Sequence, residues 1–307
     1  MEIRGFAELR RLCLHCVQII GNLADLLLSC SALEDLELIV CSGVANLNIP
    51  HRLDKLRHLL VSGTRIQMVD FHVPALTHFE FQGNAIPIAL HGCSNLEKAS
   101  LMFKTAFKRD NKALGHAFTA IPCISADKML NVYADMEARE PVWAPQVHKL
   151  MASPTCMFMF LRHLTCEIRV FTDGPNSHDG ILQLAHYLEF APQLEVLQLH
   201  MFYYTLEDSW HGQVTWVGGS CMRSLDHLKS VYMSGFRCYR AQVELLCGIL
   251  EKGAALEHVT IEPKVIIKCV SEINLDVPEE MVREWAQRTS ELFGKAINVV
   301  EGSSVLC

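Results

Sequence analysis

The pattern L-x-x-L-x-L recurs along this chain when other apolar or small residues are allowed at its second and third leucine positions. In a short strand alternate side chains share a face, so the fourth and sixth positions of the pattern point inward together. One such unit cannot bury its apolar side alone and is stabilised by stacking on its neighbours. The matches begin at Leu9, Leu33, Leu56, Leu76, Leu96, Leu161, Leu194, Leu228 and Leu256.

This repeat predicts an α/β fold, a right-handed leucine-rich-repeat solenoid of horseshoe shape. We expect a parallel sheet on the concave face and helices or loops on the convex face. The side chains expected to point inward from the sheet include Leu12, Leu36, Leu59, Leu164 and Leu197.

A second, independent signal lies three residues after the last inward position. Repeats of this class favour a small polar residue there, because its side chain can hydrogen-bond the backbone of the turn. Cys41, Thr64 and Asn84 occupy this slot in three successive repeats. The first repeat has Val17 in this slot, so the agreement is partial.

The spacing of the matches divides the chain into three parts. Residues 1–103 carry regular repeats, 20 to 24 residues apart. Residues 104–160 form an irregular segment with one degenerate repeat at Leu130 and Val132. Residues 161–307 carry longer repeats, 28 to 34 residues apart, which leave room for helices on the convex side.

Apolar residues at helical spacing predict two such helices, Ile181–Leu188 and Val243–Leu250. A last helix, from Pro278 to Ile297, is expected to cap the apolar layer that ends the stack. Its packing stripe is predicted to be Met281, Trp285, Thr289 and Leu292.

Composition limits the partners of the protein. A formal charge of −7 and a pI near 6.1 give no general attraction to nucleic acid or to anionic lipid. The local basic cluster of Lys104, Lys108, Arg109 and Lys112 is interpreted as a solvated face. The longest strictly apolar run, from Cys156 to Leu161, is far shorter than the roughly 20 residues of a spanning helix. We expect neither nucleic acid nor membrane as a partner.

Cysteine usage indicates a compartment. The 13 cysteines show no regular paired spacing, and the chain has no signal peptide and no Asn-x-Ser/Thr sequon. These features favour a reducing compartment, the cytoplasm or the nucleus, where cysteines act as small buried hydrophobes. The lone C-x-x-C of Cys13 and Cys16 is interpreted as ordinary packing, because a zinc ribbon needs a second pair.

Catalytic motifs are missing from the sequence. It contains no phosphate-binding loop, no H-E-x-x-H, no nucleophile elbow and no dinucleotide fingerprint. The nearest approach, from Gly218 to Cys221, lacks the closing glycine and is interpreted as a loop. We predict no catalytic residue, no cofactor and no metal.

The residues expected to bind a partner lie on the strands, at positions that point away from the core. Such side chains line the concave face, which scaffolds of this kind use for binding. His58 and His78 are expected on neighbouring strands about 5 Å apart. The candidates are Glu37, His58, His78, Glu80, His163, Gln198 and Tyr232. An alternative hot spot is the aromatic cluster of Trp210 and Trp216 with Tyr203 and Tyr204.

The region from Leu225 to Ile261 resembles the C-terminal FBD region of plant F-box/leucine-rich-repeat proteins. The resemblance is carried by Ser234-Gly-Phe-Arg-x-Tyr-Arg, then a helix ending in Leu250-Glu251, then Ala255-Leu256-Glu257 before a final strand. In that family the repeats recruit a target protein, and an N-terminal F-box docks the adaptor of a cullin-type ubiquitin ligase. No F-box motif precedes the first repeat here, so the adaptor is expected as a partner only if an F-box is supplied upstream.

The sequence therefore favours a non-enzymatic protein–protein interaction module, the target-recognition part of an F-box type ligase receptor that lacks its F-box. A stand-alone leucine-rich-repeat scaffold and an inactive remnant remain alternatives, as does an enzyme with an unrecognised site. A deep pocket that gathers His, Asp and Ser side chains would favour the enzyme.

Overall fold

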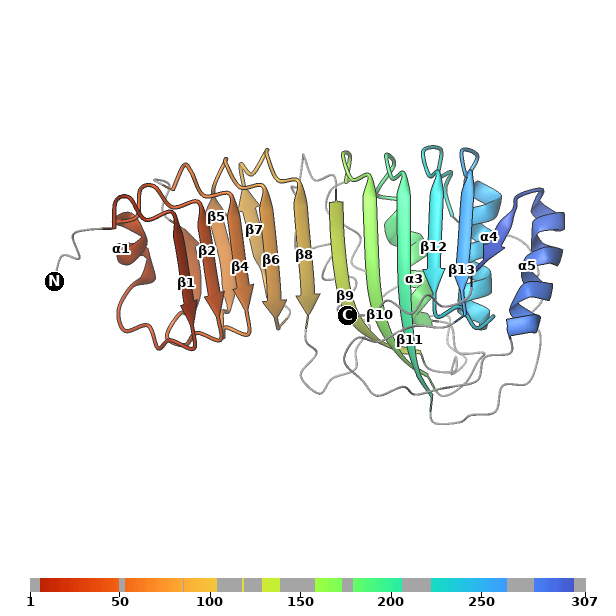
Figure 1. Ribbon diagram of the computed structural model, residues 1–307, viewed down its shortest axis with the longest axis horizontal. Coiled ribbons are helices and arrows are strands. Elements are labelled where there is room, and N and C mark those ends of the chain that lie inside the picture. The colour runs from red at the N-terminus through yellow and green to blue at the C-terminus, as the bar shows by residue number, and fades with distance from the viewer. Residues whose placement is uncertain are drawn as a thin grey trace.

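The computed structural model describes residues 6–49, 53–84, 86–103, 118, 129–138, 158–172, 179–205, 222–263 and 279–300. Its main feature is a parallel sheet of 11 strands that follows the chain from end to end (Figure 1). The strands, in sheet order, are β1 (Arg11–His15), β2 (Asp35–Ile39), β4 (His58–Ser62), β6 (His78–Gly83), β8 (Lys98–Phe103), β9 (Met129–Ala138), β10 (His163–Thr172), β11 (Val196–Thr205), β12 (Ser230–Ser234), β13 (His258–Glu262) and β14 (Ile297–Val299).

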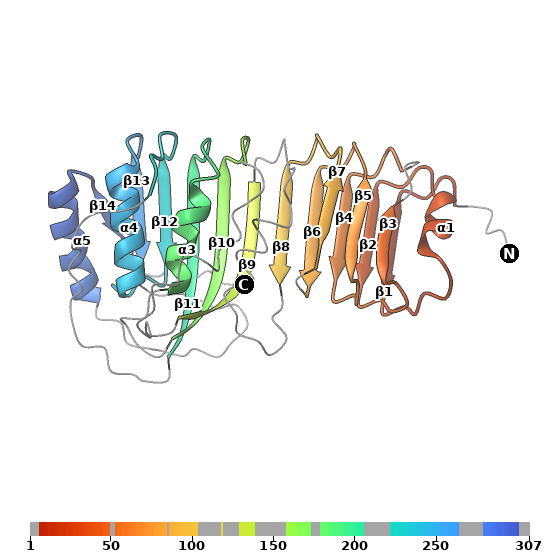
Figure 2. The same ribbon diagram turned by 180° about the vertical axis from the view of Figure 1, so that it is seen from behind.

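A second layer covers one side of this sheet (Figure 2). It consists of α1 (Leu23–Leu28), a three-stranded parallel sheet of β3 (Asn46–Ile49), β5 (Met68–His72) and β7 (Ile88–His91), and then α3 (Asp179–Leu188), α4 (Arg240–Lys252) and α5 (Glu279–Phe293). Where described residues connect two strands of the main sheet, as from β1 to β2 through α1 and from β12 to β13 through α4, the chain passes behind the sheet in a right-handed turn (Figures 1 and 2). The predicted right-handed solenoid with a parallel sheet is confirmed.

The small second sheet was not expected, and the length of the repeats explains it. Repeats of 20 to 23 residues must hold a main-sheet strand, two turns and a return pass. A return strand rises more than twice as far per residue as a helix, so only a strand spans the same height in four or five residues. Where the repeats lengthen to 33 residues, between Leu161 and Leu194, and to 28 residues, between Leu228 and Leu256, the return pass becomes α3 and α4 respectively, as predicted.

The core lies between the two layers. The inward leucines of the inner strands are 0 or 1% exposed: Leu36, Leu59, Leu164 and Leu197. Leu12 also points inward but is only partly buried, because β1 is the outermost strand. The rings of Phe71 in β5 and Phe79 in β6 join the two sheets, 6.1 Å apart and edge to face.

The polar slot behaves as predicted in two repeats out of three. The Thr64 hydroxyl donates to the Leu38 carbonyl at 3.2 Å and accepts the Cys41 backbone N–H at 3.1 Å. The Cys41 thiol in turn bonds the Leu14 carbonyl. Asn84, which follows the end of β6 at Gly83, is exposed.

The terminal helix is present, but its packing stripe differs from the prediction. The buried residues of α5 are Val282, Trp285, Ala286 and Thr289, while Leu292 is 66% exposed. The buried set follows the i, i+3, i+4, i+7 arc of a helix that packs on one side, and this arc is rotated from the predicted stripe, so that only Trp285 and Thr289 belong to both. Strand β14, which then extends the main sheet, was not predicted.

Within the residues that the structure describes, no helix is long and apolar enough to cross a membrane.

Candidate protein-binding face

The side of the main sheet that the second layer leaves uncovered is called the open face here (Figures 1 and 2). Parallel register fixes which side chains of neighbouring strands lie side by side on it. One row runs from His58 to His78, Lys98, Met129 and His163, each aligned with the next. The adjacent row runs through Glu37, Leu60, Glu80, Ser100, Asn131, Thr165, Gln198 and Tyr232. The residues proposed from the sequence therefore occupy two adjoining rows.

A cluster of His58, His78, Asp35 and Glu80 lies toward the N-terminal end of the open face. The two imidazole rings are 6.4 Å apart between centroids and meet edge to face. His58 Nδ1 lies 3.7 Å from Asp35 Oδ1, and its Nε2 lies 4.0 Å from Glu80 Oε1. Both carboxylates can therefore hold a protonated His58. The described part of the chain contains no group of three or more His, Cys, Asp or Glu with metal-binding geometry.

The Glu37 carboxylate is less accessible to a binding partner than its outward position in the sequence pattern suggested. Its Oε1 lies 2.5 Å from Arg11 Nη2, and its side chain is only 13% exposed. The hydrogen bond from Arg11, followed by that from Cys13, lowers the pKa of Glu37. Asp35 and Glu80, whose side chains are 42% and 39% exposed, are the carboxylates near His58 that face solvent.

Cys13 and Cys16 are both exposed, so the expectation that they serve ordinary packing was wrong. Cys13 occupies an outward position of β1, aligned with Glu37 of β2. Its hydrogen bond to that carboxylate raises the pKa of the Cys13 thiol. Cys16 follows the strand with a φ of 55°, which turns its side chain away from the core.

A polar network surrounds Tyr232 toward the C-terminal end of the open face. The Tyr232 hydroxyl donates to Glu262 Oε2, and burial together with this carboxylate raises the pKa of the phenol. The His200 ring lies 5.6 Å from the Tyr232 ring, and His200 Nδ1 shares a hydrogen bond of 2.9 Å with Ser234. Burial lowers the pKa of His200, and Glu262 opposes that effect. The network fixes the aromatic ring in the sheet surface.

His200, Ser234 and Glu262 were not among the residues singled out from the sequence. They align on three neighbouring strands, and they lie two positions beyond the slot that supplied Gln198 and Tyr232. Side chains two positions apart in a strand point to the same face, so the sequence could have placed these three residues on the open face as well. The serine is 3% exposed and the glutamate 7%, so this grouping does not present an accessible nucleophile.

The residues that carry the FBD resemblance build the turn between β12 and α4. Gln242 is fully buried, and its Oε1 accepts the backbone N–H groups of Arg237 at 2.8 Å and Tyr239 at 3.3 Å. Its Nε2 donates to the Gly235 carbonyl at 2.8 Å. Gly235 has a φ of 71°, a conformation that glycine adopts at little cost. The motif therefore has a structural role at this turn.

Other candidates from the sequence fall elsewhere. Tyr203 is buried and packs edge to face on Tyr239, 4.7 Å between centroids, so it belongs to the core. Trp210, Trp216, the loop from Gly218 to Cys221 and the basic cluster from Lys104 to Lys112 lie outside the described residues.

A family model described as At1g61320/AtMIF1, LRR domain, matches residues 1–294 of the chain. No curated protein matches the chain, and no solved structure matches it.

Proposed function

Because the chain belongs to the plant At1g61320/AtMIF1 leucine-rich-repeat domain family, we propose that it is a target-recognition module of an F-box type ubiquitin-ligase receptor. The coarser part of this statement follows from the family and the fold, since leucine-rich-repeat domains are typically non-enzymatic scaffolds that bind protein partners. The FBD resemblance of the C-terminal region supports the finer part.

The observation that carries the proposal is the continuous open face of the main sheet. Polar and aromatic side chains stand on it in register across strands that lie about 4.8 Å apart. A sheet anchored in a buried core loses little conformational freedom when a partner binds, so more of the contact energy appears as affinity. Contacts are proposed at Glu37, His58, His78, Glu80, His163, Gln198 and Tyr232.

Tyr232 is the proposed anchor of this surface. Tyrosine is enriched among residues that dominate binding energy, because it buries a large area and loses few rotamers. The hydrogen bond to Glu262 and the contact with His200 hold this ring in one place before binding. Gln198 lies next to it in the same row, and Glu80 lies farther along that row on β6, so both are proposed to supply polar contacts to the partner.

A double charge change in this row is expected to abolish partner capture. We predict that Glu80→Lys combined with Gln198→Lys lowers the amount of captured partner at least tenfold, because each lysine places an unpaired charge in the interface. The melting temperature is expected to change by less than about 2 °C, since surface substitutions contribute little to folding. The measurement is quantitative mass spectrometry after pull-down from plant extract with the tagged chain.

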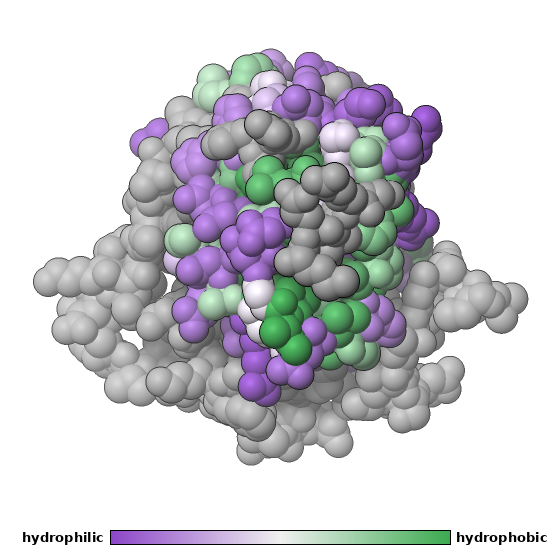
Figure 3. All heavy atoms as spheres, turned by 90° about the vertical axis from the view of Figure 1, so that its left-hand side faces the viewer, coloured by the Kyte–Doolittle hydropathy of each residue, from purple (hydrophilic) through white to green (hydrophobic). Residues whose placement is uncertain are grey.

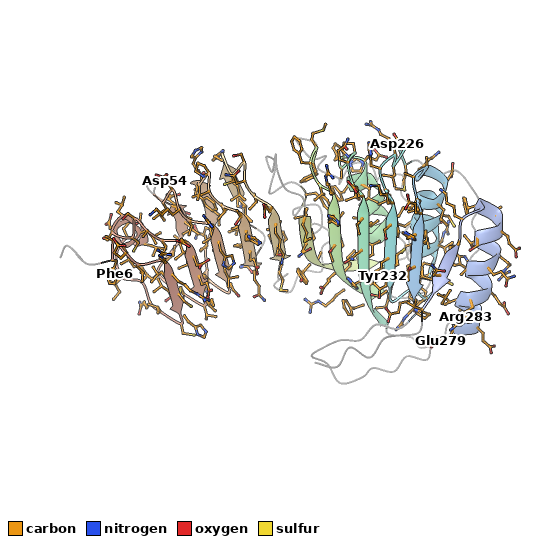
Figure 4. The ribbon with its side chains drawn as sticks, turned by 45° about the horizontal axis from the view of Figure 1, so that its top comes forward. Phe6, Asp54, Asp226, Tyr232, Glu279 and Arg283 are labelled. Carbon is orange, nitrogen blue, oxygen red and sulfur yellow. The ribbon has the colours of Figure 1, made fainter. Side chains whose placement is uncertain are left out.

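Asp54→Lys is the matched control, because it makes the same kind of charge change at an exposed position on the rim of the stack (Figure 4). It should capture the same proteins as the unmodified chain. Equal capture by the open-face variant, or loss of capture with the rim variant, would place the binding surface elsewhere.

The ligase part of the proposal predicts a dependence on an added F-box. We expect no binding of the purified cullin-ligase adaptor to the chain alone at micromolar concentration, and binding after fusion of an F-box ahead of residue 1. Proteins captured by the open face should be ubiquitylated in a reconstituted reaction only with the fusion. Adaptor binding by the unfused repeats would contradict the proposal that an F-box binds the adaptor and the repeats bind the target. Capture without ubiquitylation would leave the stand-alone scaffold as the better description.

A further inference from the structure

The first strand leaves an apolar layer uncovered at the N-terminal end of the stack. Among the strands that the structure describes, β1 ends the sheet order and pairs with β2 alone. Leu12 and Leu14 are only partly buried, whereas their aligned partners Leu36 and Leu38 are 0% exposed. Large apolar side chains stand exposed in the same first repeat: Phe6, Val17, Leu28 and Ile20, the last of these 91% exposed. Figure 3 looks onto this end and shows apolar side chains at its centre.

Among the described residues, the backbone of β1 has strand partners on its β2 side and none on its outer side. The Arg10 carbonyl accepts from Asp35 N–H, and Cys16 N–H donates to the Ile39 carbonyl, each at 2.9 Å. Backbone groups of a strand alternate between its two edges, so the even-numbered residues bond to β2. The N–H and C=O groups of Arg11, Cys13 and His15 therefore point to the free edge, which is an open template for another strand.

We propose that a second copy of this chain covers this end, by antiparallel pairing of the two β1 strands about a two-fold axis at Cys13. Arg11 of one copy then lies opposite His15 of the other, and Cys13 lies opposite Cys13. In an antiparallel ladder these are the hydrogen-bonded pairs, so every edge N–H meets a carbonyl. The free edge of β1 in one copy is thus complementary to the free edge of β1 in the second copy, as a closed two-fold interface requires.

The side chains fit the same arrangement. Between the hydrogen-bonded pairs, Leu12 of one copy lies opposite Leu14 of the other, at the close position where Cα atoms are about 4.5 Å apart. Both point to the inner side of the sheet, so the two cores become continuous across the axis. On the open face Arg11 is already paired with Glu37, so its approach to His15 adds no unbalanced charge.

An alternative is head-to-tail stacking, in which β1 of one copy pairs with the last strand of the next copy, and it satisfies fewer backbone groups of β1. The opposite end of the sheet is β14, which has three residues against the five of β1. Pairing β1 with β14 of the next copy would also leave a free edge on every assembly and produce filaments. Shifting the two-fold register by two residues leaves edge groups of Arg11 or His15 without partners.

Solution mass tests the proposal. The full chain is expected to sediment at low micromolar concentration as a dimer, at twice its mass of 34.6 kDa. Cys13→Pro should convert it to a monomer, because proline removes the two central intermolecular N–H groups and places its ring on the free edge. That N–H points away from β2, so proline breaks no backbone hydrogen bond to β2, although it also removes the bond from the Cys13 thiol to Glu37. Cys13→Ser is the matched control and should stay dimeric, and circular dichroism should show that both variants are folded.

A cross-link locates the axis. In a Cys16→Ser background, a short bismaleimide should join Cys13 to Cys13 between copies, identified by peptide mass spectrometry. A monomer at all concentrations up to about 100 μM would overturn the proposal. So would a dimer that survives Cys13→Pro, or one in which Cys13 is not joined to Cys13. Species that grow steadily with concentration would identify head-to-tail stacking in its place. The test does not involve the open-face partner, so its outcome is independent of the proposed function.

Discussion

Gln242→Leu is expected to lower the free energy of unfolding by about 3 to 5 kcal/mol. Leucine has a similar size, but it leaves two N–H groups, of Arg237 and Tyr239, and the Gly235 carbonyl without partners in a buried turn. Each unsatisfied buried group costs roughly 1 to 3 kcal/mol. Urea unfolding measures the loss, and hydrogen exchange at the Arg237 and Tyr239 amides shows whether the turn itself opens.

Gln287→Leu is the control for this change. Gln287 lies on the exposed side of α5 and bonds only an exposed carboxylate, Glu291, so its loss should stay within about 0.5 kcal/mol. A loss below about 1 kcal/mol for Gln242→Leu, with the two amides still protected, would show that the FBD-like motif is not what holds this turn.

Phe79→Ala is expected to cost about 3 to 5 kcal/mol, because the ring is 0% exposed and lies where the main sheet meets the second sheet. Its edge-to-face contact with Phe71 predicts coupling between the two positions. In a double-mutant cycle with Phe71→Ala, the two losses should fall short of additivity by about 0.5 to 1.5 kcal/mol.

Phe160→Ala controls for the removal of an aromatic ring as such. Phe160 is 54% exposed, and its substitution should change stability by less than about 1 kcal/mol. Additive losses for Phe71 and Phe79 would mean that the two sheets are stabilised separately and that the contact between them contributes little.

The main sheet was predictable because its signal is local. The three-and-two spacing of the leucines fixes which residues point inward, and Leu36, Leu59, Leu164 and Leu197 do so. The helices α3 and α4 were predictable for the same reason, since their apolar periodicity lies within one segment. The second sheet had a weaker signal, the alternation of Val69 with Phe71, which four- and five-residue strands repeat too few times to stand out.

The contacts of the candidate site were not predictable in the same way. The sequence indicated that Glu37 and Tyr232 point outward, and they do. Their neighbours Arg11 and Glu262 come from other repeats, 26 and 30 residues away, and meet them only through the register of the sheet. Whether an outward carboxylate is paired or accessible therefore depends on strand alignment, which a repeat pattern alone does not fix.

The three-stranded sheet β3–β5–β7 has a consequence for the shape of the stack. Solenoids bend because their two sides advance by unequal steps, and a helix about 10 Å wide needs more room per repeat than a strand spaced at about 4.8 Å. Between β4 and β8 both sides of this chain advance by strand spacing, in hydrogen-bonded register. We therefore expect this part of the stack to bend less than the part backed by α3 and α4, so that a long ligand would meet a flatter surface between β4 and β8 than between β10 and β13.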